Sequence, residues 1–186
     1  VKRGAQVFDR TAILRLDARP RDVVATTDNG ARIRARHVVI AAGYASQHWL
    51  PKQVARNRSS YAFVTDPISE AQLGPLTHTL VWETARPYLY MRTTGDRRLL
   101  IGGEDDDVDV PARRDARVEK KARVLMKQIA KIRPDLELTP TFSWAGTFAE
   151  TKDGLPFFGP HAATGPRVQF AMAYGGNGIT YSMLGA

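Results

Sequence analysis

The chain is organised around the stretch YGGNGIT at residues 174–180, which reads Tyr174-Gly175-Gly176-Asn177-Gly178-Ile179-Thr180. An apolar run at 168–173 predicts a strand before it, and residues 179–184 predict the start of a helix after it. The glycines let the backbone approach a ligand closely, and Asn177 is a suitable N-cap for the amides of Ile179 and Thr180. Such a turn aims free N–H groups at one point, which suits a phosphate or a polar ring edge that gains negative charge. A tight turn without a ligand is the alternative that these residues leave open.

The size and composition of the chain exclude several kinds of site. The 186 residues contain no cysteine, so there is no disulfide framework, no thiolate metal site and no cysteine nucleophile. No secretory signal pattern and no apolar run long enough to cross a membrane is present, and we expect a soluble, cytoplasmic protein. Both ends of the sequence look cut within a domain, so we expect a fragment of a longer protein.

Most of the positive charge lies in one segment. The net charge is +8, and residues 112–133 hold nine basic and two acidic side chains, hence seven of these eight charges. The segment predicts an amphipathic helix with a solvated basic face. The alternative function is a non-catalytic binding module that uses this helix to contact nucleic acid or an acidic partner. We favour a chain that binds no nucleic acid.

The first part of the chain predicts an antiparallel meander of three runs at residues 11–17, 23–27 and 31–42. Asp28-Asn29-Gly30 between the second and third runs is a hairpin signal. The third run ends in Val38-Val39-Ile40-Ala41-Ala42, and such an unbroken apolar stretch suggests burial on both faces within a layered α/β sheet.

The middle of the chain predicts a second sheet with one helix packed on it. Strands are expected at 60–65, 80–84, 88–93, 98–102 and 141–144, followed by a long loop at 145–160. The helix carries its apolar residues on one face, at Val118, Ala122, Leu125, Ile129 and Ile132.

Several common signatures are absent from the sequence. There is no GxGxxG, P-loop or GxSxG motif, and the four histidines lack metal-ligand spacing. The acidic loop at 104–109 does not have EF-hand spacing. We therefore expect no metal site.

Three separated stretches, taken together, resemble a known family. They are VVIAAG at 38–43, WAG at 144–146 with TKDGLPFFGP at 151–160, and the 174–180 turn. In this order the chain resembles the C-terminal part of the D-amino-acid-oxidase-like (DAO) family of FAD-dependent oxidoreductases, which includes glycine oxidase and γ-glutamylputrescine oxidase. YLYMR at 88–92 and LLIGGED at 99–105 also look like the substrate-domain hairpin of that family.

The resemblance implies a mixed α/β (α+β) fold with two parts. Residues 1–52 and 144–186 would belong to an incomplete FAD-binding Rossmann-type domain, and residues 57–143 to a mostly antiparallel substrate domain. Its implied cofactor-binding residues are Gly43 near the dinucleotide, Asp153 and Gly154 beside the flavin ring, and Gly175, Gly176, Asn177, Gly178, Ile179 and Thr180 at the pyrimidine edge. An ordinary turn is the alternative for Asp153-Gly154.

The family reaction is oxidation of a C–N bond of an amine or amino acid, with hydride transfer to flavin N5. Arg92 is a candidate for binding a substrate carboxylate through two hydrogen bonds, and Tyr88 and Tyr90 are candidates for lining the cavity. An ordinary hairpin with a surface arginine is the alternative.

Two departures from the family pattern matter for function. Glycine-oxidase-type enzymes carry an arginine shortly after Trp-x-Gly, whereas this chain has Thr147, Phe148, Ala149 and Glu150. This difference argues against an α-amino-acid substrate and leaves room for an amine. The βαβ unit with GxGxxG is also missing, and that unit normally holds the pyrophosphate. We therefore expect this chain alone to bind FAD weakly or not at all, and to self-associate through an exposed sheet edge.

Overall fold

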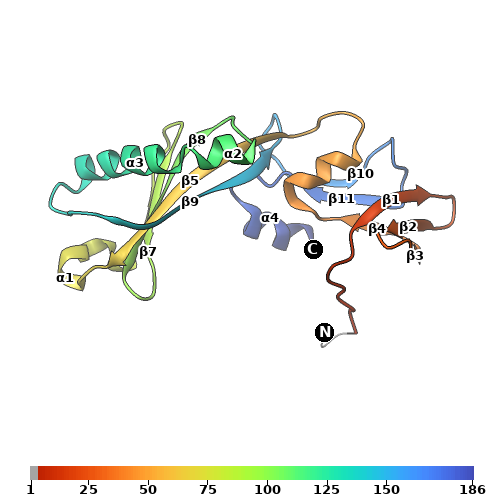
Figure 1. Cartoon of the computed structure of the whole chain (residues 1–186), viewed down its shortest axis with the longest axis horizontal. Helices are drawn as coiled ribbons and strands as arrows, with labels where there is room; N and C mark the ends of the chain where they lie inside the picture. Colours follow the sequence, from red (N-terminus) through yellow and green to blue (C-terminus); the bar gives the residue numbers. More distant parts are fainter. Residues whose placement is uncertain (1–3) are drawn as a thin grey trace. The chain divides into compact units, whose positions relative to one another are not determined.

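The computed structural model describes residues 4–186, and the chain forms two compact units. The first unit comprises Val1–Ala55 with Thr151–Ala186, and the second comprises Arg56–Glu150. Figure 1 shows the strands and helices of both. A mixed α/β fold with largely antiparallel sheets was predicted from the sequence, and it is confirmed.

The first unit begins with the predicted meander. Its strands are β1 (Ile13–Ala18), β2 (Val23–Thr27) and β3 (Arg32–Ala35), and they pair in that order as an antiparallel sheet. Asn29 closes the β2–β3 turn, because its side-chain oxygen accepts hydrogen bonds from the Thr27 hydroxyl and the Ala31 amide.

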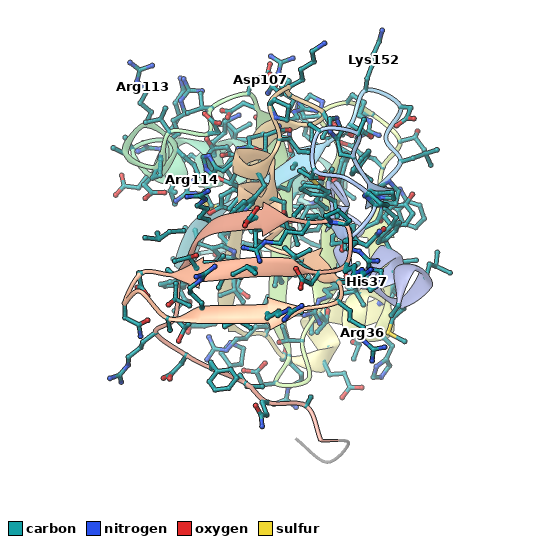
Figure 2. All side chains as sticks on the ribbon, turned by 90° about the vertical axis from the view of Figure 1, so that its right-hand side faces the viewer. Arg36, His37, Asp107, Arg113, Arg114 and Lys152 are labelled. Carbon is teal, nitrogen blue, oxygen red and sulfur yellow. The ribbon has the colours of Figure 1, made fainter. Side chains whose placement is uncertain are left out.

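The third run of the meander, predicted over 31–42, is divided between two sheets. The backbone bends at Arg36 and His37 (Figure 2), and β4 (Val38–Ile40) joins another sheet. The Arg167 guanidinium holds this bend by donating to the carbonyl oxygens of Arg36, at 3.1 Å, and Pro20, at 2.9 Å. The arginines that alternate along 32–34 belong to the exposed strand β3 of the meander. The apolar residues that follow, Val38–Ile40, form the strand that joins the second sheet.

That second sheet has the order β10 (Phe157–Pro160), β11 (Val168–Met172), β4. β4 runs parallel to β11, with Val38 opposite Val168 and Ile40 opposite Phe170, whereas β10 is antiparallel to β11. β4 is an edge strand and Val39 is 64% exposed, so the expected burial of both faces was wrong for the described chain. The 3-10 helix η1 (Gly43–Trp49) follows β4, and α4 (Gly178–Gly185) follows β11.

The second unit is built on one antiparallel sheet of order β6-β7-β8-β5-β9. These strands are β5 (Arg56–Pro67), β6 (Leu80–Trp82), β7 (Leu89–Thr93), β8 (Arg98–Asp106) and β9 (Pro140–Glu150). β9 pairs with β5 along its whole length, from Thr65↔Pro140 to Arg56↔Glu150. The loop predicted from residue 145 was therefore wrong, and the boundary between the compact units lies at Glu150 and not at 144. The glycines and prolines of 145–160 predicted a loop, but Gly146 pairs with Ser60 within the regular β5–β9 ladder.

One face of this sheet is covered by the amphipathic helix. The predicted helix at 112–133 consists of α2 (Pro111–Asp115) and α3 (Val118–Ile132), and the short α1 (Glu70–Leu73) and η2 (Gly74–His78) lie between β5 and β6. α3 lies along the sheet (Figure 1) and buries Ala122, Leu125 and Ile129 in the core with Phe63 and Ile101. Ile132 is 52% exposed, so the apolar face ends one turn earlier than predicted. Among the described residues no helix is both long and apolar enough to span a membrane.

Candidate functional site

The first unit brings three glycine-containing segments to one edge of its parallel sheet. Ile40 of β4 and Phe170 of β11 are paired in parallel, so the segments that follow, with Gly43 and Gly175, leave the sheet at the same edge. β10 runs the opposite way with Phe157 opposite Met172, so Asp153-Gly154, just before β10, lies at this edge too. We call Gly43, Asp153-Gly154 and 175–180 the sheet-edge segments. The carboxyl ends of parallel strands are where ligands bind in open α/β sheets.

The backbone at this edge is unusually shaped and open. Gly43, Gly154 and Gly175 have φ of 56°, 74° and 57°, a region that favours glycine. Added Cβ atoms at these positions would meet no other atom within 4 Å, so the backbone borders free space. Buried Ala173, at the base of the turn, has φ of 60°, a costly conformation for a residue with a side chain that is common at functional sites. The edge therefore has room for a bound group against its main chain.

The 174–180 turn leads into α4 as predicted, but its capping differs. Asn177 occupies the N-cap position, and its side chain makes no capping hydrogen bond. The reason is its backbone conformation, φ −106° and ψ 33°, which is not the extended one that directs an N-cap side chain back onto the helix. The prediction that Asn177 satisfies the amides of Ile179 and Thr180 was wrong. Those amides remain available to a ligand.

Asp153 and Gly154 form the tight turn that was the alternative reading. The Asp153 carboxylate accepts hydrogen bonds from the Thr151 hydroxyl, at 2.8 Å, and the Leu155 amide, at 3.1 Å. The Thr151 hydrogen bond, followed by that of Leu155, lowers the pKa of Asp153. The carboxylate is thus used within its own turn, and the backbone of Gly154 is what this segment offers to a ligand.

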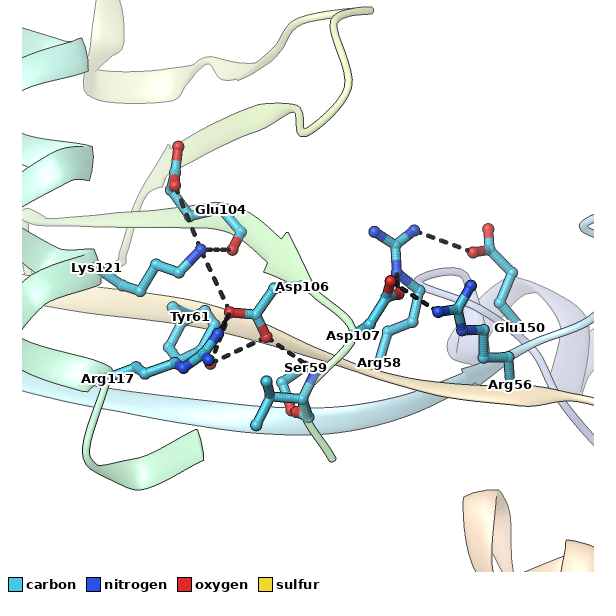
Figure 3. Close-up of polar contacts among 11 residues, drawn as sticks. Arg56, Arg58, Ser59, Tyr61, Glu104, Asp106, Asp107, Arg117, Lys121 and Glu150 are labelled. Atoms are coloured by element: carbon cyan, nitrogen blue, oxygen red, sulfur yellow. Dashed lines mark hydrogen bonds and ion pairs between the residues drawn. The ribbon is translucent and has the colours of Figure 1, made fainter. Parts of the chain in front are cut away.

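The second unit separates its polar residues onto two faces of its sheet. The face toward α3, which we call the helix face, holds the contacts of Tyr61, Glu104, Asp106, Arg117 and Lys121 drawn in Figure 3. Asp106 accepts from the Tyr61 hydroxyl at 3.2 Å and from Arg117 at 2.8 Å, and Lys121 pairs with both Asp106 and Glu104. Burial, together with the Asp106 charge, raises the pKa of Tyr61 to about 12. Basic residues of α3 are therefore used in part inside the domain.

The opposite face, which we call the open face, holds all three predicted substrate residues. Tyr88, Tyr90 and Arg92 alternate with Leu89 and Met91, which are buried on the helix face. The Tyr88 and Tyr90 ring centroids lie 6.0 Å apart. Arg92 is exposed, and no described carboxylate forms an ion pair with it. The sequence prediction thus selected residues that share one face.

Aromatic side chains line much of the open face. Trp82 of β6 pairs with Tyr90, and Phe142 and Trp144 of β9 stack with ring centroids 5.8 Å apart. Trp82 is 65% exposed and Phe142 is 64% exposed. Open aromatic surface of this extent suits a ligand or a further part of the protein.

Asp105 is a functional candidate that the sequence reading missed. It follows the β8 bulge at Gly103 and Glu104 and lies on the open face, whereas its neighbour Asp106 lies on the helix face. Burial raises the pKa of Asp105; the Ser60 hydroxyl and the charges of Arg58 and Arg86 lower it in part. The run of acidic residues at 104–109 suggested a solvated loop. Simple alternation from Leu99 and Ile101 would place Asp105 on the helix face, and the bulge reverses this, so no local signal in the sequence marked Asp105.

Asp106 contributes stability that depends on pH, which gives a direct test of the helix face. Burial opposes its ionisation, but hydrogen bonds from Arg117 and the Val108 amide outweigh this and lower its pKa. A depressed folded-state pKa means that the stabilisation is present at neutral pH and lost as the pH falls through that value. We expect Asp106→Asn to reduce the free energy of unfolding by about 1–2 kcal/mol at pH 7, because the charged hydrogen bond to Arg117 is lost. The loss stays this small because solvent partly screens Arg117.

Urea titrations at several pH values check this expectation. The difference between wild type and Asp106→Asn should shrink below about pH 4, where the carboxyl is protonated in the unfolded chain and increasingly in the folded one. Asp109→Asn is the matched control, since Asp109 is exposed in the same loop. A difference that is independent of pH would contradict this account of Asp106.

The fold defines a class of protein, an α/β unit with an open, glycine-lined sheet edge and a second, mostly antiparallel unit, and comparison with known proteins identifies the family. The family model of FAD dependent oxidoreductases (DAO) matches residues 1–186. The chain belongs to this family, whose cofactor is FAD, and the resemblance drawn from the sequence is confirmed. It is 29% identical to a glycine oxidase of Bacillus licheniformis over 181 residues, 95% of this chain and 46% of that protein.

Solved structures show the same fold. The crystal structure of glycine oxidase from Geobacillus kaustophilus matches with a TM-score of 0.74 and 23% identity, over 97% of this chain and 47% of that one. That of iminodiacetate oxidase from Chelativorans sp. BNC1 matches with a TM-score of 0.75 and 15% identity, over 95% and 46%. The chain spans about half the length of these relatives.

Proposed function

We propose that this chain is part of an FAD-dependent enzyme that oxidises a C–N bond of a small amine or amino acid. The observation that carries the proposal is that the sheet register brings Gly43, Gly154 and Gly175 to one edge with open space before their main chain. The glycine oxidase and iminodiacetate oxidase relatives support a substrate with a C–N bond.

In this proposal the first unit supplies part of the flavin site. Gly43 lies near the dinucleotide, Gly154 and Asp153 beside the ring system, and Gly175, Gly176, Asn177, Gly178, Ile179 and Thr180 at its pyrimidine edge. The free amides at the start of α4 favour negative charge there, by about 0.3–2 kcal/mol from the helix dipole. When bound, FAD would supply the electron acceptor for oxidation of the C–N bond.

The second unit supplies the substrate surface. Tyr88 and Tyr90 form an aromatic wall on the open face, and Arg92 is the cation free to bind a substrate carboxylate. The residues after Trp-x-Gly on β9 are Thr147, Phe148, Ala149 and Glu150, so no arginine follows it on this strand. This leaves room for an amine as the substrate.

The binding-module alternative stays open. Lys121 and Arg117 are engaged with Glu104 and Asp106, and Arg114 donates to Thr147 at 2.9 Å. The other basic residues of the segment are exposed, namely Arg113, Lys120, Arg123, Lys127 and Lys131. Heparin retention that falls steeply with salt would favour that alternative.

We also propose self-association, because Val39 at the β4 edge and Ile179 and Met183 of α4 are 64%, 88% and 76% exposed. Light scattering that finds a monomer at high concentration would contradict it.

Anaerobic flavin reduction tests the proposed function. The whole protein loaded with FAD, mixed with primary amines and amino acids, should lose its oxidised-flavin absorbance at a rate that depends on substrate concentration. The 186-residue chain alone should bind FAD weakly or not at all. A loaded protein that keeps its oxidised spectrum with every amine and amino acid would contradict the proposal.

A further inference from the structure

The open face contains a half-buried carboxylate with one oxygen that the fold does not use. Asp105 Oδ1 is shielded from solvent and accepts no hydrogen bond within 3.5 Å from a described residue. The Ser60 hydroxyl, also without such a bond, lies close enough to Asp105 and Tyr90 to lower the pKa of each. Burying such groups without partners is costly, and each normally has a partner in the functional state of a protein.

Two aromatic rings border this carboxylate. Tyr90 pairs with Gly102 across the β7–β8 ladder, and the main chain of Tyr88 contacts Gly103, so both tyrosines lie beside the end of β8 that carries Asp105. Burial is the main cause that raises the pKa of both tyrosines, and the charge of Asp105 adds to it. The Tyr90 ring lies directly over Gly102, where a Cβ would collide with it. A carboxylate flanked by aromatic faces is a surface that binds ammonium and guanidinium groups.

The two arginines that act on Asp105, Arg58 and Arg86, make their contacts with other groups. Arg58 contacts two other carboxylates, with Nε 3.4 Å from Asp107 and Nη1 3.4 Å from Glu150, as Figure 3 shows. Arg86 is exposed, and its guanidinium lies 5.2 Å from the centre of the Tyr88 ring. No ion pair joins Asp105 to any described cation within 4.0 Å. The site is therefore open to a cation brought by a ligand.

We propose that Asp105, with the rings of Tyr88 and Tyr90, selects a substrate that carries a second positive charge besides the amine that is oxidised. This rests on the proposed function and names its substrate class, a diamine or an amine with a distant guanidinium group. Asp105 Oδ1 and the Ser60 hydroxyl accept hydrogen bonds from that group. Asp105 is a specificity-determining residue and takes no part in the redox step.

The test compares 1,5-diaminopentane with pentylamine on the FAD-loaded whole protein. Calorimetry gives the affinities, and anaerobic flavin reduction gives the rates. We expect the diamine to bind at least about tenfold more tightly than the monoamine, as one hydrogen-bonded ion pair provides. Asp105→Asn should abolish this preference. Asp109→Asn removes one negative charge from the same loop and should leave the preference intact.

Two further variants separate a ligand site from an internal contact. If Asp105 serves only to hold Arg86, then Arg86→Gln and Asp105→Asn should have the same effect on binding. In our proposal their effects are opposite, because Arg86→Gln removes a competing cation and should strengthen diamine binding. Asp105→Asn should also leave the melting temperature at pH 7 unchanged or raised, since the raised pKa of a buried carboxyl costs stability when it ionises.

The outcomes distinguish this inference from the proposed function. A diamine preference that survives Asp105→Asn, equal affinities of the two amines, or no binding of the diamine would overturn the selection by Asp105. A preference that Asp105→Asn removes, with no flavin reduction by any amine or amino acid, would support the site and overturn the proposed reaction.

Discussion

Gly175→Val should weaken FAD binding to the whole protein by at least about tenfold, because the new side chain would project into the open space at the sheet edge, where we place the flavin. With φ of 57°, Gly175 also has a left-handed conformation that costs a residue with a side chain about 1–2 kcal/mol of folding stability. Titration of the apoprotein with FAD, followed by fluorescence, measures the effect.

Gly165→Val is the matched control for this experiment. Gly165 has φ of 75° and also has open space before it, but it precedes β11 and so lies at the opposite edge of the same sheet. It should carry the backbone cost without the loss of FAD affinity. If both variants bind FAD as tightly as wild type, or if both lose affinity equally, the sheet-edge segments do not hold the cofactor.

Leu125→Ala should reduce the free energy of unfolding of the second unit by about 2–5 kcal/mol. Leu125 is fully buried where α3 packs on the sheet, in one cluster with Phe63 and Leu99. The loss combines removal of buried apolar surface with the cavity that remains. Chemical denaturation monitored by circular dichroism measures it.

Ile132→Ala is the control on the same helix. Ile132 has the same heptad-like spacing in the sequence but is 52% exposed, so its truncation should cost clearly less, about 1 kcal/mol or below. Equal losses at the two positions would mean that α3 packs on the sheet through a different face from the one described.

The sequence predicted the glycine turn, the meander and the packed helix because each is encoded by neighbouring residues. The convergence of the three glycine segments could be anticipated only through the family resemblance, since parallel pairing of β4 with β11 joins residues more than a hundred positions apart. Asn177 shows a limit of another kind. Its residue type favours a cap, but its backbone conformation is not the extended one of an N-cap, and its side chain makes no capping hydrogen bond.

The second half of β9 and Asp105 were missed for related reasons. Residues 145–150 were assigned to a long loop because glycine and proline recur over 145–160, and only pairing with β5 makes 145–150 part of a strand. In the run of acidic residues at 104–109, nothing local tells which carboxylate is paired. Asp106 is satisfied by Arg117 and Tyr61, and Asp105 is not, because the pleat of β8 points them to opposite faces.

The glycine beneath Tyr90 limits how this surface can diverge. A methyl group at Gly102 would force the Tyr90 ring to move, and at Gly103 it would meet the main-chain oxygen of Tyr88. Neither glycine can therefore gain a side chain while both tyrosines keep their positions. A change of substrate would have to come from the side chains around Tyr88 and Tyr90. A relative with alanine at position 102 should lack tyrosine at position 90.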